Sequence, residues 1–187
     1  MRLLKFIRHY FAERLTPLIR FLHYVVLLLV LVQIILSNFM EVNDGKIGKS
    51  IVEFYSTWGH IVTGLSLVLV VLIFIYIEFK KHGFIYFFPY FFGDFTQIKL
   101  DIAQLKSFQF PDLNPKGLAA IVQCLGLGAL FLVVLSGFTW FIMWQLDLPF
   151  AEDVKAIHGL MTGLIEAYVV AHGSMGVIHL FMAYRRS

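Results

Sequence analysis

Five of the seven histidines in this chain fall inside long apolar stretches. They are His23, His60, His158, His172 and His179. A titratable side chain is costly in such surroundings and is kept where it has a partner or a function. Because imidazole is a common metal ligand, these histidines are candidates for holding a metal or a metal-containing cofactor. The two remaining histidines, His9 and His82, lie in basic segments, and we expect them to be solvated.

His158 and His172 lie fourteen residues apart in one apolar segment. In an α-helix that spacing turns the second side chain by about 40° and moves it about 21 Å along the axis. Two ligands separated in this way cannot bind the same metal ion. They can each hold a different large cofactor on nearly the same face of the helix.

The composition indicates that the elements carrying these histidines lie in a membrane. Hydrophobic residues make up 59% of the 187 residues and charged residues 14%, against about 45–50% and about 25% in an average soluble domain. Four stretches are long enough to cross a bilayer, which takes about 20 residues: residues 17–40, 54–77, 117–143 and 154–184. We expect an all-α membrane protein, a four-helix bundle that forms a single domain over residues 1–187.

Lysine and arginine are unevenly distributed, being concentrated in the N-terminal segment, the loop 78–116 and the C-terminus. The other connections hold only Lys46, Lys49 and Lys155. The positive-inside rule then predicts that both termini of this multi-pass protein are cytoplasmic. The amphipathic residues 1–15 predict a short helix on the lipid surface or, equally, an extension of the first span. We expect Trp58, Trp140 and Trp144 in the outer aromatic belt.

With this orientation, four histidines fall into two pairs by depth. His60 and His158 lie near the outer ends of their spans, whereas His23 and His172 lie nearer the cytoplasm. Each pair comes from two different helices, so each pair can hold one planar haem from both sides. Nearby glycines would let a porphyrin approach the backbone, although small residues also favour plain helix packing. These glycines are Gly64, Gly159, Gly163 and Gly176.

The histidines can also be hydrogen-bonding groups between helices, but four at matched depths on three helices favour ligation. Zinc would need three or four ligands around one ion, whereas only two histidines are expected at each of the two depths in the membrane. The single Cys124 excludes an iron–sulfur cluster, and the lack of a C-x-x-C-H motif excludes covalently attached haem. Glu166 is a candidate for a proton relay, but we expect its carboxyl group to form a hydrogen bond with Gln123, Ser136 or Thr162.

A haem with two histidine ligands has no open position on the iron, so its chemistry is one-electron transfer. Two such haems, bound non-covalently near the two faces, would carry electrons across the membrane. The expected small-molecule partner is an apolar carrier that diffuses in the bilayer, a quinone. We expect membrane lipid and a periplasmic or membrane-bound redox protein subunit as further partners, and no nucleic acid.

Four short motifs surround the histidines: FLHY at His23, WGHIVTG at His60, IHGLMTG at His158 and AHGSMGVIH at His172. Their order and the H-x13-H spacing resemble the bacterial di-haem cytochrome b561 superfamily, which includes the cytochrome b subunits of nickel–iron hydrogenases and formate dehydrogenases. The resemblance implies haem b ligation by these four histidines and electron exchange with quinone. His179 is similar to a further H-x6-H feature of some single-subunit members.

Two more side chains are candidate contacts of the cytoplasmic-side cofactor. Arg20 lies three residues before His23, on an adjacent turn, and can neutralise a haem propionate. His179, two turns beyond His172, can hydrogen-bond a quinone carbonyl or a propionate. The positive-inside rule accounts for Arg20 equally well, and contact with water accounts for His179.

The favoured function is that of the cytochrome b subunit of a respiratory oxidoreductase, which transfers electrons between a partner at the outer face and a membrane quinone. An electron-transfer subunit is favoured over an enzyme acting on its own. The first alternative is a stand-alone, quinone-linked oxidoreductase of the b561 type. The second, from a different class, is a haem-free transporter or anchor component.

Overall fold

Four long helices dominate the computed structural model, which describes residues 2–43 and 45–186. They are α2 (Pro17–Ser37), α3 (Ile51–His82), α6 (Leu118–Gln145) and α7 (Ala151–Arg186). All four are long and apolar enough to cross a membrane, which confirms the predicted all-α bundle of four spans. The helix α7 has a mean hydropathy of 1.4 in its most apolar window, against 2.4 to 2.6 for the others.

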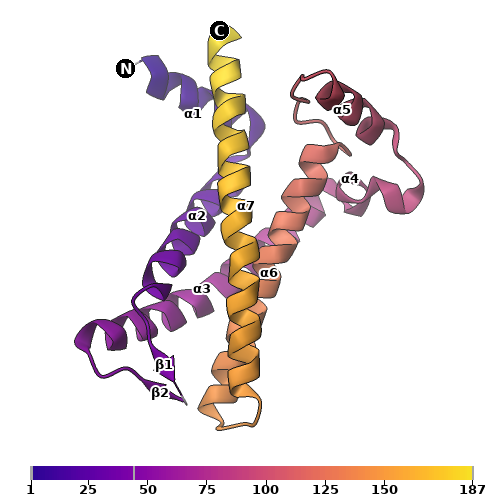
Figure 1. Cartoon of the computed structure of the whole chain (residues 1–187). Coiled ribbons are helices and arrows are strands. Elements are labelled where there is room, and N and C mark those ends of the chain that lie inside the picture. The colour runs from indigo at the N-terminus through magenta and orange to yellow at the C-terminus, as the bar shows by residue number, and fades with distance from the viewer. Residues whose placement is uncertain (1, 44, 187) are drawn as a thin grey trace.

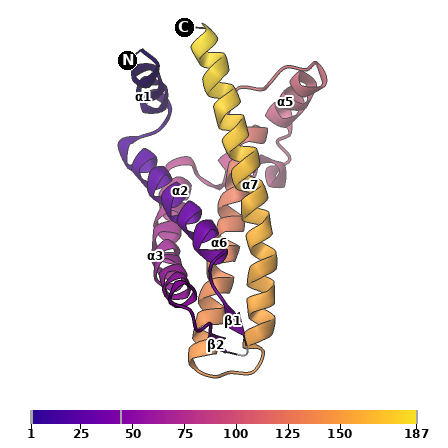
Figure 2. The same ribbon diagram turned by 60° about the vertical axis from the view of Figure 1, so that its left-hand side comes forward.

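Shorter elements connect the four helices. The helix α1 (Arg2–Arg14) precedes α2, and a hairpin of β1 (Val42–Asn43) and β2 (Lys46–Ile47) joins α2 to α3. The helix α4 (Phe84–Phe87), the 3-10 helix η1 (Pro89–Phe92) and the helix α5 (Thr96–Lys106) lie between α3 and α6. Figures 1 and 2 show α1, α5 and the end of α7 at one end of the bundle, and the hairpin at the other. Both termini therefore lie at the same end.

Local capping explains where two of the spans begin. Thr16 adopts an extended conformation, and its Oγ1 accepts a hydrogen bond from the Ile19 amide at 3.5 Å, with Pro17 at the first helical position. The helices α1 and α2 are thus separate, as the prediction of a short N-terminal helix requires, and α1 is not an extension of the first span. The helix α3 begins with a capping box in which Ser50 and Glu53 bond to each other's backbone amides.

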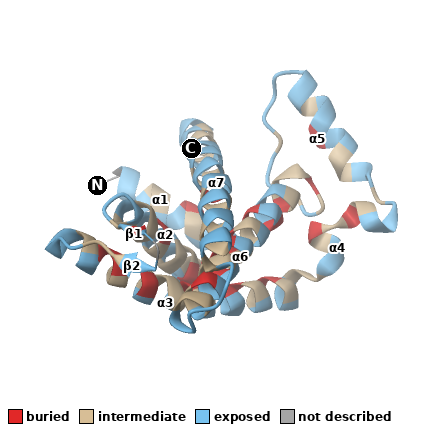
Figure 3. Cartoon of the chain, turned by 60° about the horizontal axis from the view of Figure 1, so that its bottom comes forward, coloured by how far each residue is buried: buried red, intermediate tan, exposed pale blue. Residues whose placement is uncertain are grey.

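The core of the bundle lies on the facing sides of the four helices. Its buried members are Val30 of α2, Leu67 and Val71 of α3, Leu130, Val133 and Val134 of α6, and Ile165 of α7. Figure 3 shows buried residues along α3 and α6, whereas much of α7 is exposed. The helix α7 buries only 6% of its most apolar window, so most of its surface faces lipid or another molecule.

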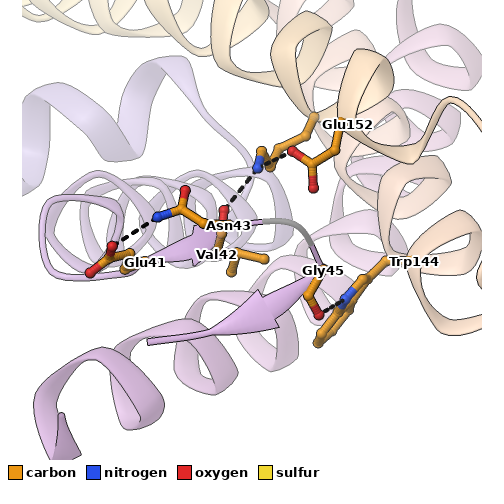
Figure 4. Close-up of polar contacts among 7 residues, drawn as sticks. Glu41, Val42, Asn43, Gly45, Trp144 and Glu152 are labelled. Carbon is orange, nitrogen blue, oxygen red and sulfur yellow. Dashed lines mark hydrogen bonds and ion pairs between the residues drawn. The ribbon is translucent and has the colours of Figure 1, made fainter. Parts of the chain in front are cut away.

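The hairpin packs against the ends of α6 and α7. The Trp144 Nε1 donates a hydrogen bond to the Gly45 carbonyl at 2.9 Å, and Lys155 Nζ donates to the Val42 carbonyl at 2.8 Å (Figure 4). Trp140 is buried and stacks on Trp144, with ring centres 5.4 Å apart. The prediction that Trp140 anchors the protein in an outer lipid belt is wrong, because this ring packs beneath the hairpin.

A fully buried carboxylate attaches α5 to the start of α6. Asp101 Oδ2 accepts a hydrogen bond from the Leu118 amide at 2.7 Å, and Oδ1 accepts one from Gln97 Nε2 at 2.7 Å. Asp101 therefore satisfies a free amide at the N-terminus of α6 from another helix. A side chain at Gly117 would overlap with this carboxylate, which explains the glycine there.

Candidate functional site

The structure brings four histidines of the apolar segments together in two pairs. The ring centres of His60 (α3) and His158 (α7) lie 6.2 Å apart, with 79° between the ring planes. Those of His23 (α2) and His172 (α7) lie 6.0 Å apart, with 51° between the planes. Two imidazoles that bind the same metal ion from opposite sides, each with a metal–nitrogen distance of about 2 Å, have ring centres about 6 Å apart. Both separations suit a pair of axial ligands.

A cavity of about 240 Å³ opens beside the first pair, between α2, α3, α6 and α7. His60 and His158 line it, and its walls are otherwise largely apolar. Side chains added at Gly159 and Gly163 of α7 would meet no atom within 4 Å. The turns of α7 next to His158 therefore face open space, as a site for a large planar cofactor requires.

Hydrogen bonds fix the tautomer of His158. Its Nδ1 lies 3.1 Å from the Val133 carbonyl and 3.1 Å from Ser136 Oγ. Because a carbonyl only accepts, Nδ1 carries the proton and Nε2 keeps its lone pair free. Metal-bound histidines characteristically donate their second nitrogen in this way. Gly137 lies directly against the ring, since a Cβ there would come within 2.9 Å of His158 Cε1.

The partner His60 has a buried nitrogen that the chain leaves unsatisfied. Its Nδ1 has no hydrogen-bond partner within residues 2–43 and 45–186. Gln33 of α2 instead donates to the His60 carbonyl at 2.9 Å and to Thr63 Oγ1, which holds α2 against this turn of α3. A buried polar atom without a partner calls for a group from outside the described chain. The imidazole pair therefore fits a bound cofactor better than a purely structural contact.

Tyr168 supports His172 in the second pair. The two residues are one turn apart on α7, their rings stack with centres 5.0 Å apart, and the Tyr168 hydroxyl lies 3.2 Å from His172 Nδ1. Tyr168 is packed against α6 at Gly126, where any side chain would overlap with its ring. This hydroxyl therefore holds one of the two ring nitrogens of His172. Neither Tyr168 nor Gly126 was identified from the sequence, because their importance depends on contacts between helices.

The remaining predicted site residues lie apart from the two pairs. Arg20 is half-buried and lines a separate cavity between α1 and α2. His179 is half-buried on α7, and its imidazole makes no hydrogen bond or ion pair with any residue that the structure describes. In the described ranges there is also no group of three histidine, cysteine or acidic side chains able to hold a metal ion, which is the number of ligands that a zinc site would need.

Glu166 is not bonded as predicted. It lines the cavity beside His60 and His158, and its carboxyl group makes no hydrogen bond within the described chain. Of its expected partners, Ser136 lies against His158 and the Thr162 hydroxyl donates to the Gly159 carbonyl. Glu166 is therefore an acidic group that faces the same space as the first histidine pair.

A second acidic group was missed by sequence reasoning. Glu78 is buried near the end of α3, and its carboxylate lies 3.8 Å from His82 Nε2. The His82 ring also packs on Tyr86, with ring centres 4.4 Å apart, so the prediction of a simply solvated His82 is wrong. Burial and the nearby Glu78 carboxylate raise the pKa of Tyr86. The spacing of these three residues, four apart each time, was the available signal.

The comparison with protein families decides the assignment. A family model described as prokaryotic cytochrome b561 matches residues 14–186, nearly the whole chain. This chain belongs to the prokaryotic cytochrome b561 family. No curated protein and no solved structure matches it. As a cytochrome b561, the protein is a multi-pass membrane cytochrome that binds haem b and serves electron transport, which argues against the haem-free transporter or anchor.

Proposed function

We propose that this cytochrome b561 binds two b haems and transfers electrons across the bacterial inner membrane. His60 and His158 would hold one haem, and His23 and His172 the other. The observation that supports this proposal is the pair of ring separations, 6.2 and 6.0 Å, at two levels of α7. A b haem with two histidine ligands supplies one-electron transfer and leaves no iron position open to substrate.

The protein's own groups orient these ligands. The Val133 carbonyl accepts the proton of His158 Nδ1, which leaves Nε2 free to ligate. In the proposed arrangement the Tyr168 hydroxyl accepts the proton of His172 Nδ1 in the same way, and its Nε2 would ligate. Such outer bonds also raise the basicity of the ligating nitrogen. Apolar walls around the first pair keep water away, which favours outer-sphere electron transfer over side reactions.

The partners follow from the placement of charge and of the two pairs. The positive-inside rule puts α1, the loop with α5 and the end of α7 in the cytoplasm, so His60 and His158 would lie toward the outer face. We propose a redox protein subunit as the partner at that face and a membrane quinone near the pair His23 and His172. His179, on the same helix two turns further, is a candidate for binding the quinone carbonyl or a propionate. A stand-alone quinone-linked oxidoreductase is the alternative.

Haem counting on single variants tests this function. Purified wild-type protein and the variants His23→Ala, His60→Ala, His158→Ala and His172→Ala would be compared by dithionite-reduced minus oxidised spectra and by haem per chain. We expect two haems in wild type, one of them lost with His60 or His158, and the other lost with His23 or His172. His9→Ala serves as the control, because His9 is exposed and pairs with Glu13 on the surface of α1. A single haem per wild-type chain would refute the two-haem proposal.

A further inference from the structure

A second cavity, of about 400 Å³, lies between α1 and α2, apart from the histidine pairs. Its lining consists of Leu4, Ile7 and Arg8 from α1 and of Arg20 and Tyr24 from α2. Two guanidinium groups therefore face one space across the junction of two helices. The apolar side chains around them make this space amphipathic.

The positive charges in this cavity have no acidic partner. The guanidinium groups of Arg8 and Arg20 make no ion pair or hydrogen bond within residues 2–43 and 45–186. The nearby acid of α1, Glu13, is engaged by His9 at 2.9 Å and by Arg14 at 4.0 Å. Two unpaired arginines beside one cavity indicate an anionic ligand. The planar guanidinium fork matches the oxygens of a phosphate group in particular.

The surroundings of the arginines indicate a ligand with acyl chains. Tyr24 is 52% exposed, and Leu28 and Leu31, one and two turns further along the same side of α2, are 64% and 41% exposed. In a membrane protein such apolar surface faces lipid tails. His23 points to another side of α2, about 100° away from Tyr24, where it meets His172. The cavity thus opens toward the bilayer and away from the histidine pair.

We propose that this cavity is a binding site for an anionic phospholipid, whose headgroup phosphate is held between Arg8 and Arg20 and whose acyl chains lie along Leu28 and Leu31. The bound lipid attaches α1 to α2 at the membrane surface. It also compensates charge that would otherwise repel across the junction. The helix α1 reaches α7 as well, through the edge-on contact of Phe6 with Tyr184, so the lipid stabilises one end of the bundle.

Native mass spectrometry of the purified cytochrome in detergent tests the site. Phosphatidylglycerol, phosphatidylcholine and inorganic phosphate would each be titrated onto wild type and onto the double variant Arg8→Gln/Arg20→Gln. The matched control is Arg185→Gln/Arg186→Gln, which removes the same charge from the same end of the bundle. Circular dichroism would check the helix content of both variants. We expect phosphatidylglycerol to bind about 30-fold more weakly to the first variant, with little change in the control.

Three outcomes would overturn the proposal. An equal loss in both double variants would mean general attraction by surface charge. Binding of inorganic phosphate as tight as that of phosphatidylglycerol would mean a site for a free anion. Unchanged lipid binding together with a shifted haem midpoint potential in Arg8→Gln/Arg20→Gln would mean that the arginines hold a haem propionate. None of these readouts depends on how many haems the protein binds, so the lipid site and the proposed function can fail separately.

Discussion

The replacement of Gly137 by alanine tests whether the position of the His158 ring matters for cofactor binding. An added Cβ would lie 2.9 Å from His158 Cε1 and 3.2 Å from Nδ1. Ordinary van der Waals contact begins near 3.4 Å, so the imidazole ring must move by about half an ångström. That movement disturbs both the Nδ1 bond to the Val133 carbonyl and the direction of Nε2.

The expected size of this effect follows from the cost of overpacking. An extra carbon forced into a filled site costs about 1–3 kcal/mol. If that cost falls on the ligated state, the affinity for the haem proposed beside His60 drops about 5- to 150-fold. The haem beside His23 is expected to keep its affinity, because Gly137 lies against neither of its proposed ligands.

The assay is haem titration of the protein depleted of haem, followed by difference spectra that resolve the two proposed haems. Gly128→Ala is the matched control, since the same substitution on the same helix meets no atom within 4 Å. Both variants gain the same helix propensity, which removes that contribution from the comparison. Equal haem affinities for Gly137→Ala and Gly128→Ala would refute the reasoning that His158 must keep this position to bind haem.

Three more predictions concern single polar contacts of the protein. Tyr168→Phe removes the hydroxyl beside His172 and should weaken haem binding there about 10-fold, seen by haem titration, with the other haem unaffected; an equal effect on both haems would contradict this. Asp101→Ala leaves the buried Leu118 amide unpaired and should destabilise the fold by about 1–3 kcal/mol, measured as a lower unfolding midpoint. Asp112 is exposed, so the control variant Asp112→Ala should keep the unfolding midpoint of wild type. The Lys116 ammonium beside Asp94 holds the pKa of that carboxyl below its usual value of 3.8, so the pair stabilises the protein at neutral pH and ceases to do so as the pH falls through the lowered pKa. The unfolding midpoint of Asp94→Asn should therefore approach that of wild type only in acid; a difference that does not depend on pH would argue against the ion pair.

Hydropathy and helical period accounted for the large-scale arrangement. The four spans lie within a few residues of their predicted bounds, because about 20 apolar residues have few alternatives to a membrane helix. The period of 3.6 residues placed His158 and His172 on nearly the same face of α7, and depth suggested their partners on α2 and α3. The structure brings those rings close, while their ligation of haem stays a prediction.

The supporting contacts could not be read from the sequence. Gly137 matters because it lies under His158 of another helix, and Asp101 because it bonds to an amide 17 residues away. Such contacts depend on the rotation of one helix against another, which apolar periodicity does not determine when both faces are apolar. The hairpin at Val42 was missed for a different reason, since strands of two residues are too short to show alternation.

The helix α7 contributes one histidine to each pair, whereas α2 and α3 contribute to one pair each. The distance between the two proposed redox centres thus depends on the length of α7 between His158 and His172, and not on the loops. Any sliding or turning of α7 would change both centres together. Deletion of one residue between His158 and His172 would turn one ligand away by about 100°, whereas insertion of seven would return it to nearly the same face about 10 Å further along. Since electron tunnelling slows steeply with distance, the length of this one helical segment would set the rate of electron transfer between the two proposed haems.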